Sequence, residues 1–78
     1  MNSINLQDSF LNKVRKEKIT IIIFLNNGHK VAGTVAGFDN YVIFVETEKG
    51  QQLIYKHAIT SILPSRPVRI FSNDVTEG

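Results

Sequence analysis

The sequence predicts a mainly β domain with an N-terminal α-helix, in which five short antiparallel strands form a strongly bent sheet that curls into a small open barrel. Three observations lead to this fold class. Apolar residues recur at helical spacing only near the start of the chain, and short runs of strand-forming residues separated by turn residues follow. Two glycines interrupt the second of these runs, and glycine within a strand usually marks a bend or a bulge.

The first predicted element is a helix over about residues 5–17. Asn5 is a suitable N-cap, and Asp8 occupies the third helical position, where a carboxylate can accept hydrogen bonds from the free backbone N–H groups of the first turn. The apolar stripe consists of Leu6, Phe10, Leu11 and Val14. The polar and basic side chains fall largely off this stripe and face water or a partner. The helix is expected to end near Glu17 or Lys18, because β-branched residues follow.

Two strands joined by a tight turn are predicted next. Residues 19–25 are rich in isoleucine and too few for a convincing helix, which favours a strand buried on much of both faces. The Asn-Asn-Gly sequence at 26–28 tolerates the positive φ angles of a hairpin turn. The second strand covers about residues 29–38, where Gly33 and Gly37 predict the bend that a barrel needs.

Three shorter strands are predicted over residues 41–47, 51–55 and 58–63. Turns at 39–40 and 48–50 precede the first two, and Pro64 stops the last. An open barrel leaves two strand edges unpaired, and a chain of 78 residues has a thin core. Both properties favour oligomerisation by strand addition between copies.

Composition argues against an enzyme, a metalloprotein and a membrane protein. The chain has no cysteine, which excludes disulfides and thiolate metal sites. His29 and His57 have no companion at metal-ligand spacing, and the glycines do not form a phosphate loop. No apolar run approaches the ~20 residues of a membrane span, and residues 1–8 lack the pattern of a signal peptide. We therefore expect a cytoplasmic protein with no cofactor, no metal, no membrane association and no small-molecule substrate.

Two clusters of residues indicate chemistry. The string Tyr55-Lys56-His57 places an aromatic ring, a cation and an imidazole together, which are the side chains that bind single-stranded nucleic acid. Four cations fall within residues 13–18, where only Glu17 opposes them. Each cluster taken alone is also compatible with a solvated surface.

The motifs around these clusters resemble the Hfq family, the bacterial Sm-like RNA chaperones. The similarity covers about residues 5–67, with order and spacing retained. The segments that carry it are Leu6-Gln7-Asp8, Phe10-Leu11-Asn12, Phe24-Leu25, Asn27-Gly28, Gly33-Thr34-Val35, Phe38-Asp39 and Ile54-Tyr55-Lys56-His57-Ala58-Ile59. The resemblance implies an Sm-like RNA-binding domain over residues 1–67, with its strands within about 19–63, followed by a short flexible C-terminal tail over 68–78. It also implies a homohexameric ring closed by pairing of the fourth and fifth strands of neighbouring copies.

The family binds RNA on three surfaces, and the resemblance assigns residues of this chain to each. The proximal face, around the pore, takes uridine-rich strands and corresponds to Gln7, Asn40, Tyr41, Lys56 and His57. The distal face takes adenine-rich or purine-rich strands and corresponds to Phe24, Asn27, Gly28, His29, Lys30, Val31, Ala32, Gln52 and Ser61. The rim corresponds to Asn12, Arg15, Lys16 and Lys18. Ala32 and His29 depart from common family members, so the resemblance does not fix the purine sequence that the distal face prefers.

The expected function is therefore that of an RNA chaperone that holds a small regulatory RNA and a messenger RNA and speeds their base pairing, without covalent chemistry. Two alternatives remain at this point. A ring-forming adaptor would use the exposed aromatic residues for protein contacts. A small hydrolase at a subunit boundary would rely on His57 and on the carboxylates Asp39, Glu46 and Glu48, for which the sequence marks no nucleophile.

Overall fold

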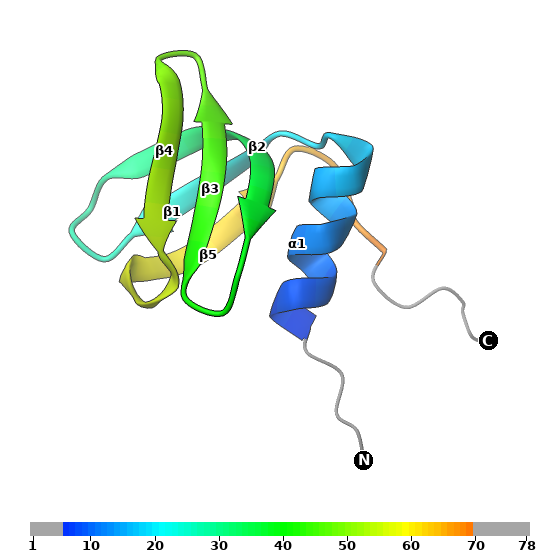
Figure 1. The fold of residues 1–78 in the computed structure, drawn as a ribbon, viewed down its shortest axis with the longest axis horizontal. Helices are drawn as coiled ribbons and strands as arrows, with labels where there is room; N and C mark the ends of the chain where they lie inside the picture. Colours follow the sequence, from blue (N-terminus) through cyan, green and yellow to red (C-terminus); the bar gives the residue numbers. More distant parts are fainter. Residues whose placement is uncertain (1–5, 70–78) are drawn as a thin grey trace.

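The computed structural model describes residues 6–69, and its elements follow the predicted order (Figure 1). They are α1 (Leu6–Glu17), β1 (Ile21–Leu25), β2 (Lys30–Phe38), β3 (Val42–Thr47), β4 (Gly50–Tyr55), the 3-10 helix η1 (Lys56–Ala58) and β5 (Ile59–Pro64). The strands form one five-stranded antiparallel sheet in the order β4-β3-β2-β1-β5. The predicted fold class is confirmed. The predicted cap Asn5 lies outside the described residues.

The sheet bends because β2 changes its pairing partner partway along its length. Residues 30–33 pair with β1, and residues 34–38 pair with β3 except for an irregularity between Val35 and Gly37. Gly33 lies at this change. A Cβ atom at Gly33 would overlap the backbone carbonyl oxygen of Glu46 and would lie 2.9 Å from Cγ1 of Val45. The two halves of the sheet can therefore approach each other this closely only because residue 33 has no side chain.

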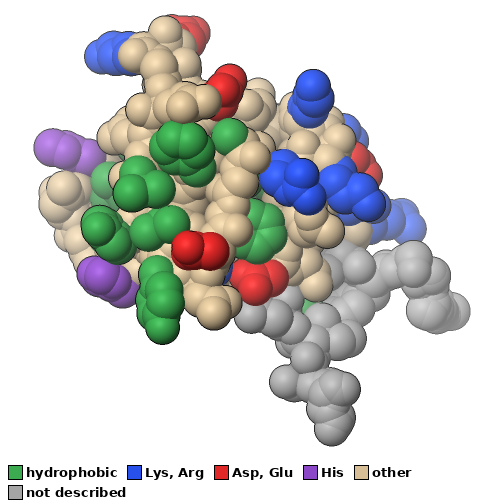
Figure 2. All heavy atoms as spheres, viewed as in Figure 1, with side chains coloured by type: hydrophobic (Ala, Val, Ile, Leu, Met, Phe, Trp, Pro, Cys, Tyr) green, Lys and Arg blue, Asp and Glu red, His purple; other side chains and the backbone are tan. Residues whose placement is uncertain are grey.

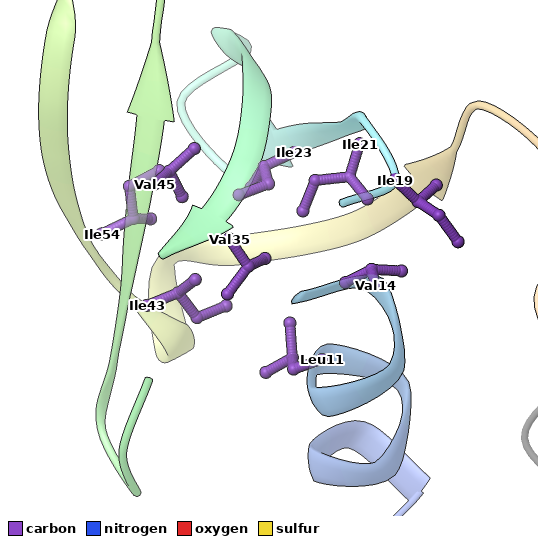
Figure 3. Close-up of a cluster of buried hydrophobic side chains, with 9 residues drawn as sticks. All are labelled: Leu11, Val14, Ile19, Ile21, Ile23, Val35, Ile43, Val45 and Ile54. Atoms are coloured by element: carbon purple, nitrogen blue, oxygen red, sulfur yellow. The ribbon is translucent and has the colours of Figure 1, made fainter. Parts of the chain in front are cut away.

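The hydrophobic core fills the space between the bent sheet and α1 (Figure 3). Its buried members are Leu11, Val14, Ile19, Ile21, Ile23, Val35, Ile43, Val45 and Ile54. Phe10 packs partly buried against this cluster, as its place on the helical stripe predicts. The placement of Leu6 on that stripe is wrong, because its side chain is 51% exposed. Leu6 is five residues before Leu11, which rotates it by about 140° around the helix from the buried face.

The helix α1 ends at Glu17, as predicted, through an arrangement that the sequence did not indicate. Lys18 has a φ of 55°, in the left-handed region that usually requires glycine. The backbone N–H of Ile19 donates to the carbonyl of Val14 at 3.0 Å, and that of Lys18 donates to the carbonyl of Arg15 at 3.3 Å. These two bonds form a Schellman motif, which brings the buried side chains of Ile19 and Val14 together.

Two details of the predicted strands are corrected. The first strand begins at Ile21 and not at residue 19. Its two faces differ, since Ile21 and Ile23 are fully buried while Ile22 and Phe24 are only half-buried on the opposite face.

The described part of the chain contains no helix with the length and hydropathy needed for a membrane span.

The close approach at Gly33 predicts the effect of a methyl group there. Gly33→Ala should lower the free energy of unfolding by ~1–3 kcal/mol, because the added methyl must displace the backbone of β3. Gly37→Ala is the matched control, since a Cβ at Gly37 has no atom within 4 Å and its φ is not positive. Urea denaturation of the three proteins at equal concentration measures the difference. Equal stability of the two variants would contradict a steric role for Gly33.

The left-handed conformation of Lys18 predicts a stabilising substitution. Lys18→Gly should raise the free energy of unfolding by about 0.5–1 kcal/mol, because glycine adopts this conformation without the penalty that a Cβ incurs. Lys16→Gly removes the same charge two residues earlier, inside the helix, and should lower the free energy of unfolding by about 1 kcal/mol. Thermal melts of both variants, compared with the parent, decide the outcome. Destabilisation by both variants would mean that Lys18 is not held at positive φ.

Candidate functional site

Predicted site residues from three parts of the chain meet beside η1. The backbone N–H of Lys56 donates to the carbonyl of Tyr41 at 2.8 Å, which joins η1 to the β2–β3 turn. The Nζ of Lys56 lies 3.0 Å from Oδ1 of Asp8, which joins η1 to α1. Gln7 precedes Asp8 and lines, together with Lys56, a cavity of about 260 Å³. His57 follows within η1, so these predicted residues lie in one region of the fold.

Tyr41 lies on an exposed turn that the carboxylate of Asp39 stabilises. Oδ1 of Asp39 accepts hydrogen bonds from the backbone N–H groups of Tyr41 at 2.8 Å and of Val42 at 2.9 Å. These two donors lower the pKa of Asp39 below its ordinary value, because they stabilise its ionised form. Tyr41 is 73% exposed, so its ring does not face the core. Asn40 lies in the same turn and is also exposed.

The side chain of Lys56 is held in place and only 12% exposed. Besides Asp8, its amine faces the ring of Phe38, with 5.4 Å between Nζ and the ring centroid. Sequence reasoning assigned Asp8 only to helix capping. The two residues are 48 positions apart, and no local pattern indicates their contact.

An aromatic pair is formed by the two residues that flank Lys56 in the sequence. The rings of Tyr55 and His57 have centroids 5.7 Å apart and planes tilted by 33°, and both residues are exposed. Exposed rings of this kind are suited to stacking with the bases of a single strand.

A second group of predicted residues lies on the face of the sheet opposite the core. Phe24 of β1 pairs with Lys30 of β2 and with Ser61 of β5, so the three residues form a row across three strands. Phe24 alternates with the fully buried Ile23, which places its ring on the outer face. Ser61 also lines the smaller cavity near Gln7.

A larger cavity of about 680 Å³ lies between the β1–β2 and β3–β4 hairpins. The predicted residues that line it are His29, Lys30, Val31, Ala32 and Gln52. The hairpin turn itself is formed by Asn27, whose Oδ1 accepts from the backbone N–H of His29 at 2.9 Å, and by Gly28 at a φ of 92°. Sequence reasoning missed the lining residues Thr20, Leu25, Gly33, Thr47, Glu48 and Lys49. Most of these belong to turns or strands whose approach depends on the bend of β2.

The predicted rim residues occupy the exposed side of α1. Figure 2 shows Lys and Arg side chains gathered over the helix, apart from the apolar side chains over the sheet. Nη2 of Arg15 donates to Oδ1 of Asn12 at 2.6 Å. Lys16 is exposed within the last helical turn, and Lys18 is exposed directly after it.

Two of the three carboxylates considered for catalysis have structural partners. Glu46 accepts a hydrogen bond from Nε2 of Gln51 at 2.9 Å across the β3–β4 pair, and Asp39 holds the β2–β3 turn. Within residues 6–69, no group of three or more His, Asp or Glu side chains is placed to hold a metal ion. These contacts favour a binding surface over a reaction centre.

The comparisons with known proteins agree with this geometry. A protein of Alkaliphilus metalliredigens named RNA-binding protein Hfq is 53% identical over 77 residues, which cover 99% of this chain and 96% of that protein. A protein of the same name from Alkaliphilus oremlandii is 58% identical over 67 residues, covering 86% of this chain and 84% of its own. These names describe binding and not a reaction, in agreement with the prediction that the chain is not an enzyme.

A solved structure and a family model extend this similarity to the fold. The crystal structure of the pleiotropic translational regulator Hfq superposes with a TM-score of 0.73 at 32% identity, covering 76% of this chain and 98% of that one. The family model described as Hfq protein matches residues 6–69. The chain therefore belongs to the Hfq family.

Proposed function

We propose that this chain is an RNA chaperone, which binds single-stranded RNA on three surfaces of a homohexameric ring and promotes base pairing between a small regulatory RNA and a messenger RNA. The observation that carries the proposal is the meeting of Gln7, Tyr41, Lys56 and His57 beside η1, in a chain whose relatives are named RNA-binding proteins. Residues 1–67 are the RNA-binding domain on this proposal, and 68–78 are a tail. The site of action is the cytoplasm, where both RNA classes meet.

The proximal surface is proposed to take uridine-rich ends. Tyr41 supplies the stacking ring, which its exposure of 73% supports. Gln7 and Lys56 read the uracil edge, and His57 contacts the terminal ribose or phosphate. The ion pair with Asp8 limits how far the Lys56 amine reaches, so its contribution depends on the base entering close to η1.

The distal surface is proposed to bind purine-rich strands along the row formed by Lys30, Phe24 and Ser61. Phe24 offers a ring for stacking, and Lys30 offers a charge for phosphate. Ala32 cannot donate a hydrogen bond to a base edge. Discrimination among purine tracts therefore depends on His29 and Gln52, which line the larger cavity together with Lys30.

The rim is proposed to hold both RNAs without sequence preference. Asn12, Arg15, Lys16 and Lys18 are all exposed, and repetition around a ring would place many cations along one edge. These cations would raise the local concentration of the two RNAs and screen the repulsion between their phosphates, which speeds annealing.

Ring closure is supported by the two strands that end the sheet. β4 and β5 each have one neighbour in the chain, so each leaves a row of backbone groups without a strand partner within the described residues. Large apolar side chains are exposed on or beside these strands, namely Phe44 (37%), Leu53 (52%), Tyr55 (54%) and Leu63 (55%). Pairing of β4 with β5 of the next copy would cover both edges and these side chains.

The first test concerns Tyr41. Tyr41→Ala should weaken binding of a short uridine oligomer by ~1–3 kcal/mol per stacked base, and Tyr41→Phe should retain most of the affinity because its ring still stacks. Fluorescence anisotropy titrations measure both variants. Thermal melts serve as the control, because an exposed ring contributes little to folding.

Unchanged affinity in Tyr41→Ala would remove the stacking role of this residue. No measurable binding of uridine oligomers by the parent protein would favour the adaptor alternative.

The second test concerns assembly. Native mass spectrometry at micromolar concentration should give six copies of the chain. Leu53→Lys should shift the population toward smaller species, because it places a charge on the exposed side of an edge strand. Asn26→Lys adds the same charge on the exposed β1–β2 turn and should leave the ring intact. A stable monomer of the parent protein would contradict ring formation.

A further inference from the structure

The exposed side of α1 has a second flank that the proposed rim does not use. Successive helical residues turn by about 100°. With Lys16 at the centre of the exposed side, Asn12 and Arg15 fall on one flank, and Lys13 and Glu17 fall on the other. The second flank carries a cation and an anion side by side.

Glu17 holds two cations on this flank, one with each carboxylate oxygen. Oε2 lies 3.1 Å from Nζ of Lys13, and Oε1 lies 3.4 Å from Nη2 of Arg66. Arg66 reaches the helix from the end of β5, where the backbone N–H of Ser65 donates to the carbonyl of Thr20 at 2.9 Å. The side-chain hydrogen bond from Lys13, followed by the charges of Lys13 and Arg66, lowers the pKa of Glu17. The carboxylate is therefore ionised at neutral pH.

These ion pairs are open to competition. The side chains of Lys13, Glu17 and Arg66 are 42%, 38% and 57% exposed, and ion pairs this exposed to solvent contribute little to stability. A phosphate group offers arginine a bidentate, charge-assisted contact that a single carboxylate oxygen does not. An RNA backbone that reaches this flank can displace Glu17 from both cations.

We propose that Lys13 and Arg66 form a second phosphate-binding site beside the rim, and that the Glu17 carboxylate occupies it when no RNA is bound. The proposal rests on the proposed rim function and extends it to two cations outside the residues assigned there. After displacement the negative charge of Glu17 stays close to the bound phosphate. The repulsion weakens phosphate binding and favours dissociation of the RNA. Glu17 thus limits the affinity of the rim.

The test compares two variants that each lose one negative charge. Glu17→Gln frees the two cations, whereas Glu46→Gln removes a carboxylate on β3 whose partner is Gln51. The probe is a fluorescent single-stranded RNA of mixed sequence without uridine or adenine tracts, titrated between 50 and 200 mM KCl. Glu17→Gln should bind more tightly at 50 mM. Its salt slope should steepen by about 0.7 for each cation that Glu17 keeps from phosphate in the parent complex, which is an extra loss of about 2.6-fold per cation across this salt range.

Further variants decide whether Lys13 and Arg66 cause the higher affinity and steeper salt slope of Glu17→Gln. Adding Lys13→Ala and Arg66→Ala to Glu17→Gln should return the slope to the parent value, and a slope that stays steep overturns the proposal. Equal gains in Glu17→Gln and Glu46→Gln overturn it as well, because net charge alone would then account for them. Arg15→Ala with Lys16→Ala tests the rim itself. Loss of affinity in that variant, together with no specific gain in Glu17→Gln, rejects this inference and leaves the rim function standing.

Discussion

The packing of Gly33 against the backbone of Glu46 is the constraint on which the rest of the structure depends. One strand serves two neighbours, because residues 30–33 pair with β1 and residues 34–38 pair with β3. The resulting bend turns the two halves of the sheet toward each other, so that their buried side chains share one core. A flat sheet of the same strands would leave these side chains on an open surface, with only α1 to cover them.

The bend also determines where the candidate binding surfaces lie. One end of the molecule carries η1 and the β2–β3 turn, which meet through the hydrogen bond between Lys56 and Tyr41. The larger cavity lies between the β1–β2 and β3–β4 hairpins, and the β1–β2 turn also contacts η1, because the backbone N–H of Asn26 donates to the carbonyl of Ala58 at 2.8 Å. The helix lies to the side of both, with its charged residues outward (Figures 1 and 2). A small domain thereby presents three chemically different surfaces, and Ser61 of the distal group also lines the smaller cavity beside Gln7 and Lys56.

Sequence reasoning was most accurate where local chemistry decides the structure. β-branched runs, the Asn-Asn-Gly turn and the helical stripe located the elements to within about two residues, and the glycine at 33 indicated the bend. It missed what depends on distant contacts, such as the pairing of Asp8 with Lys56 across 48 positions. It also missed the left-handed Lys18, since lysine carries no local signal for positive φ. The resemblance named residues for each surface, but only the folded chain shows which of them lie within reach of one another.

The Asp39 turn has a consequence for how the molecule responds to acid. Its lowered pKa means that the ionised carboxylate supports the fold at all pH values above the ordinary value of 3.8, and that this support is lost only as the pH falls through the lower folded value. The same carboxylate holds the backbone that presents Tyr41. Moderate acidification therefore leaves this turn in place, and acid release of a base stacked on Tyr41 would have to come from groups other than Asp39.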